Sequence, residues 1–136
     1  MITRAEELIA AANHELITLG NLDCIEKYFS PNYEARSGKK TGSGHDFVRK
    51  FIQSLRKSIP DVKVQQVEIL SQSGNEVTWQ RTLTGTHKKA MQGIPASGKN
   101  VTWTEMLVSR FDGDLIAEDC MVSELAGQLM IKLGRS

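Results

Sequence analysis

The sequence predicts an α+β fold in which helices come first and an antiparallel sheet follows. Apolar residues recur at helical spacing up to Pro60, and beyond it they alternate with polar residues. Because the helices are grouped before the strands, we expect them to cover one face of a curved sheet. The 136 residues suit a single domain over residues 1–136, and no repeat or linker divides them.

The first helix is expected between Thr3 and Gly20. Thr3 and Glu6 form a capping-box pattern, and Gly20 ends the apolar repeat that follows it. A short second helix, capped by Asn21 or Asp23, is expected to run through Tyr28 and Phe29 and to be stopped by Pro31. The polar segment SGKKTGSG after it is interpreted as a loop.

A third helix is predicted over residues 45–58, with Pro60 ending it. Four strands are then expected over residues 62–71, 76–87, 100–111 and 115–124, and a short helix over residues 125–133. The turns Ser73-Gly74-Asn75 and Asp112-Gly113-Asp114 favour hairpins between neighbouring strands. These strands form an antiparallel meander.

Alternation along the last three strands assigns an inward face to each. The expected inward residues are Val77, Trp79, Arg81, Leu83 and His87, then Val101, Trp103, Glu105, Leu107 and Phe111, then Ile116, Glu118, Cys120, Val122 and Glu124. Ionisable groups on an apolar face require either a charged partner or a functional role, because burying an unpaired charge is costly. Arg81 and Glu105 can oppose each other as a structural ion pair, or the acids can line a pocket that raises their pKa values.

Charge and composition limit the classes of molecule that this protein is expected to bind. Lys and Arg number 17 against 16 Asp and Glu, a net charge of +1, which argues against nucleic-acid binding and an anionic membrane surface. The two cysteines, Cys24 and Cys120, favour reduced thiols and a cytoplasmic protein without an export signal. His14 and His45 have no ligands at metal spacing, so no metal site is expected.

Several segments together resemble one known family. PDVKVQQVEIL from Pro60, GTH from Gly85, GIPASGK from Gly93 and RFDGDLIAED from Arg110 occur in the order found in SnoaL-like polyketide cyclases. These belong to the nuclear transport factor 2-like superfamily, with ketosteroid isomerases and epoxide hydrolases. The resemblance implies a cone, in which a curved, mainly antiparallel sheet encloses a cavity with the helices. It also implies an intramolecular aldol reaction on a polyketide ester without metal or organic cofactor.

The resemblance also implies a catalytic acid. The family pattern Ile-Val-Glu-x-Trp-x-x-x-Asp, laid without gaps from Arg110, places Cys120 on the aromatic position and Glu124 on the acid. Glu124 is therefore the expected base, Glu105 its companion, and His87 or the Trp103 Nε1 group the donor to an enolate oxygen. The expected substrate contacts are Trp79, Arg81, Trp103, Glu118, Cys120 and Val122.

Plainer interpretations stand beside these roles. His87 more readily holds the following loop in shape, and Glu118 can pair with Arg81 or Lys99 on the sheet. Cys120 is read as a small buried residue rather than a nucleophile. Glu124 can also be an exposed residue where a strand ends.

Three functions remain open from the sequence. The first is a cofactor-free lyase or isomerase acting on a hydrophobic keto compound. The second is a module of the same fold that binds a small molecule or forms a homodimer through its outer, Thr- and Gln-rich sheet face, without turnover. The third is water addition to an epoxide, with Arg81 between Glu105 and Glu118.

Overall fold

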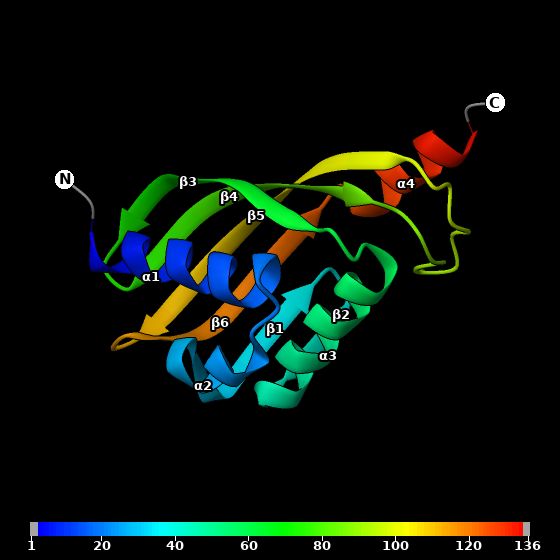
Figure 1. Ribbon diagram of the computed structural model, residues 1–136. Helices are drawn as coiled ribbons and strands as arrows, with labels where there is room; N and C mark the ends of the chain where they lie inside the picture. Colours follow the sequence, from blue (N-terminus) through cyan, green and yellow to red (C-terminus); the bar gives the residue numbers. More distant parts are fainter. Residues whose placement is uncertain (1–2, 135–136) are drawn as a thin grey trace.

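The computed structural model describes residues 3–134, and it has the α+β architecture that the sequence predicts (Figure 1). One mixed sheet of six strands, in the order β2-β1-β6-β5-β4-β3, curves over helices α1, α2 and α3. All neighbouring strands are antiparallel except β1 and β6. The elements are α1 (Arg4–Ala12), η1 (Asn13–Thr18), η2 (Leu22–Cys24), α2 (Ile25–Tyr28), β1 (Phe29–Ser37), β2 (Lys40–Ser43), α3 (Gly44–Ser58), β3 (Lys63–Ser73), β4 (Glu76–Thr86), β5 (Asn100–Asp112), β6 (Leu115–Ser123) and α4 (Leu125–Gly134).

The predicted first helix is present, but its last part is not α-helical. The Thr3 side chain accepts a hydrogen bond from the Glu6 backbone N–H at 3.1 Å, which caps α1. From Asn13 the chain continues as a π-helix, η1, whose wider turns are often found at functional sites. Gly20 follows it in the left-handed region, at φ 70°, as the predicted end requires.

Strands β1 and β2 are the main difference from the sequence prediction, which placed a helix stop and a loop there. Pro31 lies within β1, in a stretch where the register with β6 shifts between Phe29 and Glu34. A strand tolerates proline at such an irregularity, because fewer ladder hydrogen bonds are needed there. The parallel partner of β1 is distant in sequence, so the local pattern of residues 29–43 carries little information about this pairing.

The meander from β3 to β6 is confirmed, and so are the predicted inward faces of β4 and β5 along Val77–Leu83 and Val101–Phe111. One group of buried side chains packs between the sheet and helices α1 and α3, and a second lies toward α4. Trp103 belongs to the second group, while Trp79 belongs to the first. No helix within residues 3–134 is long and apolar enough to cross a membrane.

Candidate functional site

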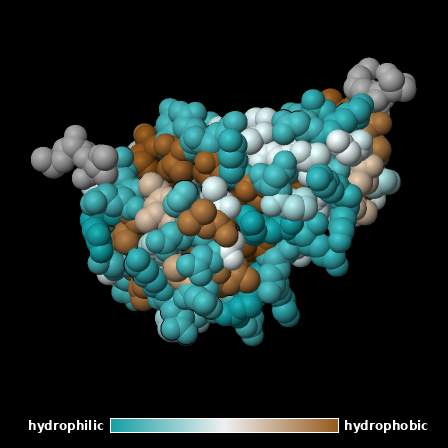
Figure 2. Space-filling model, in the orientation of Figure 1, coloured by the Kyte–Doolittle hydropathy of each residue, from teal (hydrophilic) through white to brown (hydrophobic). Residues whose placement is uncertain are grey.

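A cavity of about 400 Å³ lies between the inner sheet face and the segments α1, η1 and α3. This is within the size range of small-molecule sites. Its wall is mainly apolar and includes Leu16, Phe47, Phe51, Trp79, Leu107 and Met121. Figure 2 shows a largely hydrophilic surface on the helix-bearing side, with hydrophobic residues visible between the hydrophilic ones. The polar side chains on its wall include Asn13, Tyr33, Arg81, Glu105, Asp119 and Ser123.

The first polar cluster is built on the ion pair of Arg81 and Glu105. The two residues lie directly opposite each other on β4 and β5, as alternation predicts. Arg81 Nε donates to Glu105 Oε1 at 2.8 Å, and Nη2 lies 2.7 Å from the same oxygen. Only 8% of the Arg81 side chain and 5% of the Glu105 side chain is exposed. Both charges have lost their contacts with water, and each is stabilised by the other instead.

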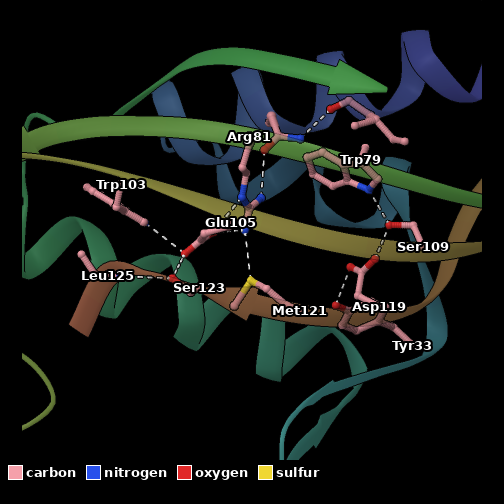
Figure 3. Close-up of polar contacts among 12 residues, drawn as sticks. Tyr33, Trp79, Arg81, Trp103, Glu105, Ser109, Asp119, Met121, Ser123 and Leu125 are labelled. Atoms are coloured by element: carbon pink, nitrogen blue, oxygen red, sulfur yellow. Dashed lines mark hydrogen bonds and ion pairs between the residues drawn. The ribbon is translucent and has the colours of Figure 1, made fainter. Parts of the chain in front are cut away.

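Glu105 has two further donors on its other oxygen (Figure 3). Trp103 Nε1 donates to Glu105 Oε2 at 3.1 Å, and Ser123 Oγ donates to the same atom at 2.7 Å. The carboxylate therefore has four nitrogen or hydroxyl contacts from three residues. The Trp103 indole is occupied by this contact and lies behind Glu105 rather than on the cavity wall.

Asn13 joins η1 to this cluster. Its Oδ1 atom accepts from Arg81 Nη1 at 2.9 Å, and its Nδ2 atom donates to the backbone oxygen of Ile9 at 2.8 Å. The side chain is buried, with 5% of the residue exposed. The helix thus fixes the amide, and the amide in turn fixes the guanidinium.

The second polar cluster surrounds Asp119 on β6 (Figure 3). Ser109 Oγ makes a short hydrogen bond to Asp119 Oδ1, and the Tyr33 hydroxyl donates to Oδ2 at 2.7 Å. Trp79 Nε1 donates to Ser109 Oγ at 2.8 Å, so these four residues form a chain. Burial raises the pKa of Asp119, while the hydrogen bonds from Ser109 and Tyr33 and the charge of Arg81 oppose that rise.

Tyr33 is affected by the same environment. Burial raises its pKa, and the neighbouring Asp119 carboxyl adds to the effect. The phenol therefore stays protonated and remains a donor. In this cluster a titratable carboxyl is held by two hydroxyl groups on the wall of an apolar cavity, an arrangement typical of a general acid or base.

The predicted inward face of β6 is wrong, and a β-bulge is the reason. Arg110 opposes Glu118 but Phe111 opposes Ile116, so Ala117 is an extra residue in β6. The alternation reverses beyond it, and Asp119, Met121 and Ser123 face the cavity. The residues that were expected to face inward are exposed instead: Glu118, Cys120, Val122 and Glu124.

Each corrected residue has different surroundings from those expected. Glu118 pairs with Arg110 instead of Arg81, and its Oε1 atom lies 3.7 Å from Arg110 Nε. The expected arrangement of Arg81 between Glu105 and Glu118 is therefore not formed. Val122 is 74% exposed, and Cys120 is an exposed free thiol. Neither of them lines the cavity.

Glu124 lies outside the cavity, where β6 ends. Its Oε1 atom accepts from the Thr104 backbone N–H at 2.8 Å and from the Thr104 hydroxyl at 2.7 Å. The hydrogen bond from the Thr104 hydroxyl has the larger effect and the one from the backbone N–H the smaller, and both lower the pKa of Glu124. Its neighbour Ser123 is the residue that reaches Glu105, so the expected pairing of Glu105 with Glu124 is wrong.

The Gly85-Thr86-His87 motif holds the end of β4 in place. A side chain at Gly85 would put its Cβ 2.2 Å from Ile59, so only glycine fits against α3's end. The Thr86 N–H and hydroxyl donate to Asp61 at 2.7 and 2.8 Å, which lowers the pKa of Asp61. These contacts fit the structural interpretation of the motif.

His87 is fully buried and does not line the cavity. Its backbone N–H donates to the Lys99 oxygen at 3.1 Å, and its own oxygen accepts from Gly98 N–H at 2.9 Å. Both ring nitrogens lack a hydrogen-bond partner among residues 3–134. The described contacts of His87 thus connect it to the loop after β4 rather than to Glu105.

Sequence reasoning missed Asp119, Tyr33 and Asn13. Asn13 had a usable signal, because it interrupts an apolar helical repeat four residues after Ile9. Asp119 and Tyr33 had none that alternation could supply, since a bulge and an unexpected strand place them. Across residues 3–134, no three His, Cys, Asp or Glu residues are grouped as metal ligands.

Solved structures with the same fold are numerous. A candidate polyketide cyclase from Acidithiobacillus ferrooxidans superposes with a TM-score of 0.83 at 21% identity, covering 98% of this chain and 97% of that one. AclR from Streptomyces galilaeus, described as a candidate hydroxylase, gives 0.82 at 23% identity over 100% and 88%. A candidate SnoaL-like polyketide cyclase from Jannaschia gives 0.84 at 18% identity over 98% and 94%.

A search of curated proteins finds no match to this chain. The family model described as SnoaL-like polyketide cyclase, in contrast, matches residues 7–130. This range includes both polar clusters and all six strands of the sheet. The chain belongs to the SnoaL-like polyketide cyclase family.

Proposed function

We propose that this protein is a cofactor-free acid–base enzyme that acts on a hydrophobic keto compound, with Asp119 as the group that takes and returns a proton. The observation that carries the proposal is the position of Asp119, a buried carboxyl with a raised pKa on an apolar cavity wall. Membership of the cyclase family supports a role of this kind on a small molecule.

The chemistry begins at a carbon next to a carbonyl group. Asp119 accepts a proton from that carbon, the C–H electrons move toward the carbonyl oxygen, and an enolate forms. In an aldol cyclisation the enolate carbon bonds to a second carbonyl carbon, whose oxygen takes the proton from Asp119. In an isomerisation the proton returns to a different carbon of the same ligand.

The contacts of Asp119 leave room for this role. An ionised carboxylate has about four lone-pair sites, of which Ser109 and Tyr33 occupy two. The two hydroxyl groups hold the carboxyl in one orientation, which a reacting group requires. Burial away from water raises its proton affinity, as removal of a proton from a carbon acid requires.

The test is proton exchange in heavy water, which needs no knowledge of the natural substrate. A panel of aryl and cyclic ketones is incubated with the protein, and loss of the α-proton signal is followed by nuclear magnetic resonance. We expect exchange above the buffer rate for at least one ketone, with loss of the effect in Asp119→Asn. Ketone binding without exchange by the wild type would instead favour a binding module.

We also propose a homodimer formed through the outer sheet face, as an assembly role of the same fold. Exposed apolar residues adjoin one another there, because Met106 pairs with Val122 and Val108 pairs with Cys120 across β5 and β6. Sedimentation of the wild type is expected to give twice the chain mass, and Val122→Glu to give a monomer. A monomeric wild type would remove this role and leave the cavity chemistry untouched.

A further inference from the structure

Arg81 retains a hydrogen-bond donor that its protein contacts do not use. A guanidinium group has five N–H bonds, one on Nε and two on each terminal nitrogen. Nε and Nη2 contact Glu105, Nη2 also lies 3.6 Å from the Met121 sulfur, and Nη1 donates once to Asn13. Within the described part of the chain, the second N–H on Nη1 has no acceptor, and Arg81 lines the cavity.

Asn13 offers a second donor beside the first. Its Nδ2 group has two N–H bonds, and only one is used, by the Ile9 oxygen. The orientation of the amide is fixed, because Oδ1 must face the Arg81 donor. Asn13 also lines the cavity. A neutral amide donor from η1 and a cationic guanidinium donor from β4 therefore lie together at its wall.

The local charge suits an oxygen that becomes negative during a reaction. Glu105 balances the charge of Arg81, and Trp103 and Ser123 stabilise the Glu105 carboxylate from its other side. A neutral carbonyl oxygen can therefore approach without displacing a counter-ion. Because every partner of Arg81 and Asn13 is provided by the protein, the donors need no rearrangement when charge develops.

We propose that Arg81 and Asn13 form an oxyanion site, which accepts the carbonyl oxygen of a neutral aromatic or conjugated ketone and stabilises its enolate. The apolar walls at Phe47, Phe51 and Trp79 take the ring system of such a ligand. This assignment rests on the proposed function, which states that Asp119 removes the proton from the carbon next to the carbonyl group. The donors themselves are independent of Asp119, so the two ideas fail separately.

The probe is 2-naphthol, a planar phenol whose absorbance spectrum reports whether its oxygen is ionised. Hydrogen bonds donated to an ionised oxygen lower the pKa of its acid, whereas an apolar cavity without donors raises it. We therefore expect bound 2-naphthol to ionise at a lower pH than free 2-naphthol, by about 1 unit. An unchanged or raised pKa of the bound naphthol contradicts the proposal, and so does the absence of any binding.

Variants identify the donors. Asn13→Leu removes one donor and the anchor of Arg81, and it is expected to abolish at least half of the naphthol pKa shift. The double variant Arg81→Gln with Glu105→Gln removes the guanidinium donor without leaving a lone buried charge, and it is expected to abolish at least half of the shift. Glu124→Gln is the control, because Glu124 lies outside the cavity and its replacement should leave the shift unchanged.

The proposed function is separated from this site by Asp119→Asn. That variant is expected to lose ketone exchange while it still lowers the pKa of bound 2-naphthol. A full naphthol shift in Asn13→Leu and in the double variant would overturn the oxyanion site, whatever the exchange rates are. Normal naphthol shifts with no exchange by the wild type would overturn the catalytic role alone.

Discussion

Glu105 and Asp119 are buried carboxyl groups on neighbouring strands that line the same cavity, yet their partners differ. Glu105 contacts the Arg81 guanidinium through two nitrogen atoms, whereas the donors to Asp119 are the hydroxyls of Ser109 and Tyr33. Glu105 thus has a directly contacting cation that balances its charge. Asp119 has hydroxyl donors instead, and burial raises its pKa against their effect. The comparison separates an ion pair from a buried carboxyl whose contacts are neutral hydroxyls.

The largest expected effect is on catalysis by Asp119→Asn. Removing a general base typically lowers the rate by about 10²- to 10⁴-fold, and the amide keeps the shape of the cavity. The exchange rate of a responsive ketone in heavy water measures this directly. Retained binding of 2-naphthol is the control for folding, and an exchange rate within a few-fold of the wild type would exclude Asp119 as the base.

Breaking the ion pair is expected to affect stability most. Arg81→Met leaves Glu105 buried without its cation and should lower the free energy of unfolding by about 3–5 kcal/mol. Replacing both residues, by Met and Leu, should recover most of this loss, because the uncompensated charge is gone. Urea denaturation of the two variants gives the comparison, and equal destabilisation of the single and double variants would contradict the pairing.

The pH dependence of stability tests the raised pKa of Asp119. The folded protein binds the Asp119 proton more tightly than the unfolded chain does, because burial raises the pKa of Asp119. The free energy of unfolding should therefore fall as the pH rises from the ordinary Asp range through that raised pKa. Asp119→Asn removes this contribution, so its stability relative to the wild type should increase with pH. Thermal unfolding from pH 4 to pH 8 measures the difference, and a difference independent of pH contradicts it.

Ser109→Ala tests the hydrogen-bond chain. The Ser109 hydroxyl lowers the pKa of Asp119, so its removal should raise that pKa further and move the acid limb of the pH–rate profile to higher pH. Trp79 Nε1 also loses its acceptor, at a cost of about 1–3 kcal/mol in stability. A purely structural role for Ser109 would reduce stability without moving the profile.

The smallest effect is expected for Glu124→Gln. The amide oxygen can still accept from the Thr104 N–H and hydroxyl, so ketone exchange should stay close to the wild-type rate. The same measurement on this variant is the matched control for Asp119→Asn. Loss of ketone exchange in Glu124→Gln would instead identify Glu124, at the end of β6, as the base.

Alternation along β4 and β5 was sufficient to predict the Arg81–Glu105 contact, because those strands pair in an unbroken register. It failed on β6, where the extra residue Ala117 moves Asp119 inward and Glu118 outward. A bulge depends on how two strands fit together, and a single strand's pattern does not contain that information. Tyr33 was missed for a related reason, since β1 is stabilised by its distant parallel partner.

The most direct measurement is the titration of the Asp119 side-chain carbon, followed by carbon-13 magnetic resonance in protein labelled at aspartate. The signal absent from Asp119→Asn identifies the residue. We expect a titration midpoint above the ordinary range for aspartate, and a midpoint that rises further in Ser109→Ala. A midpoint at or below the ordinary value would show a permanently ionised carboxylate, and it would contradict the role of Asp119 as the proton-exchanging group of the cavity.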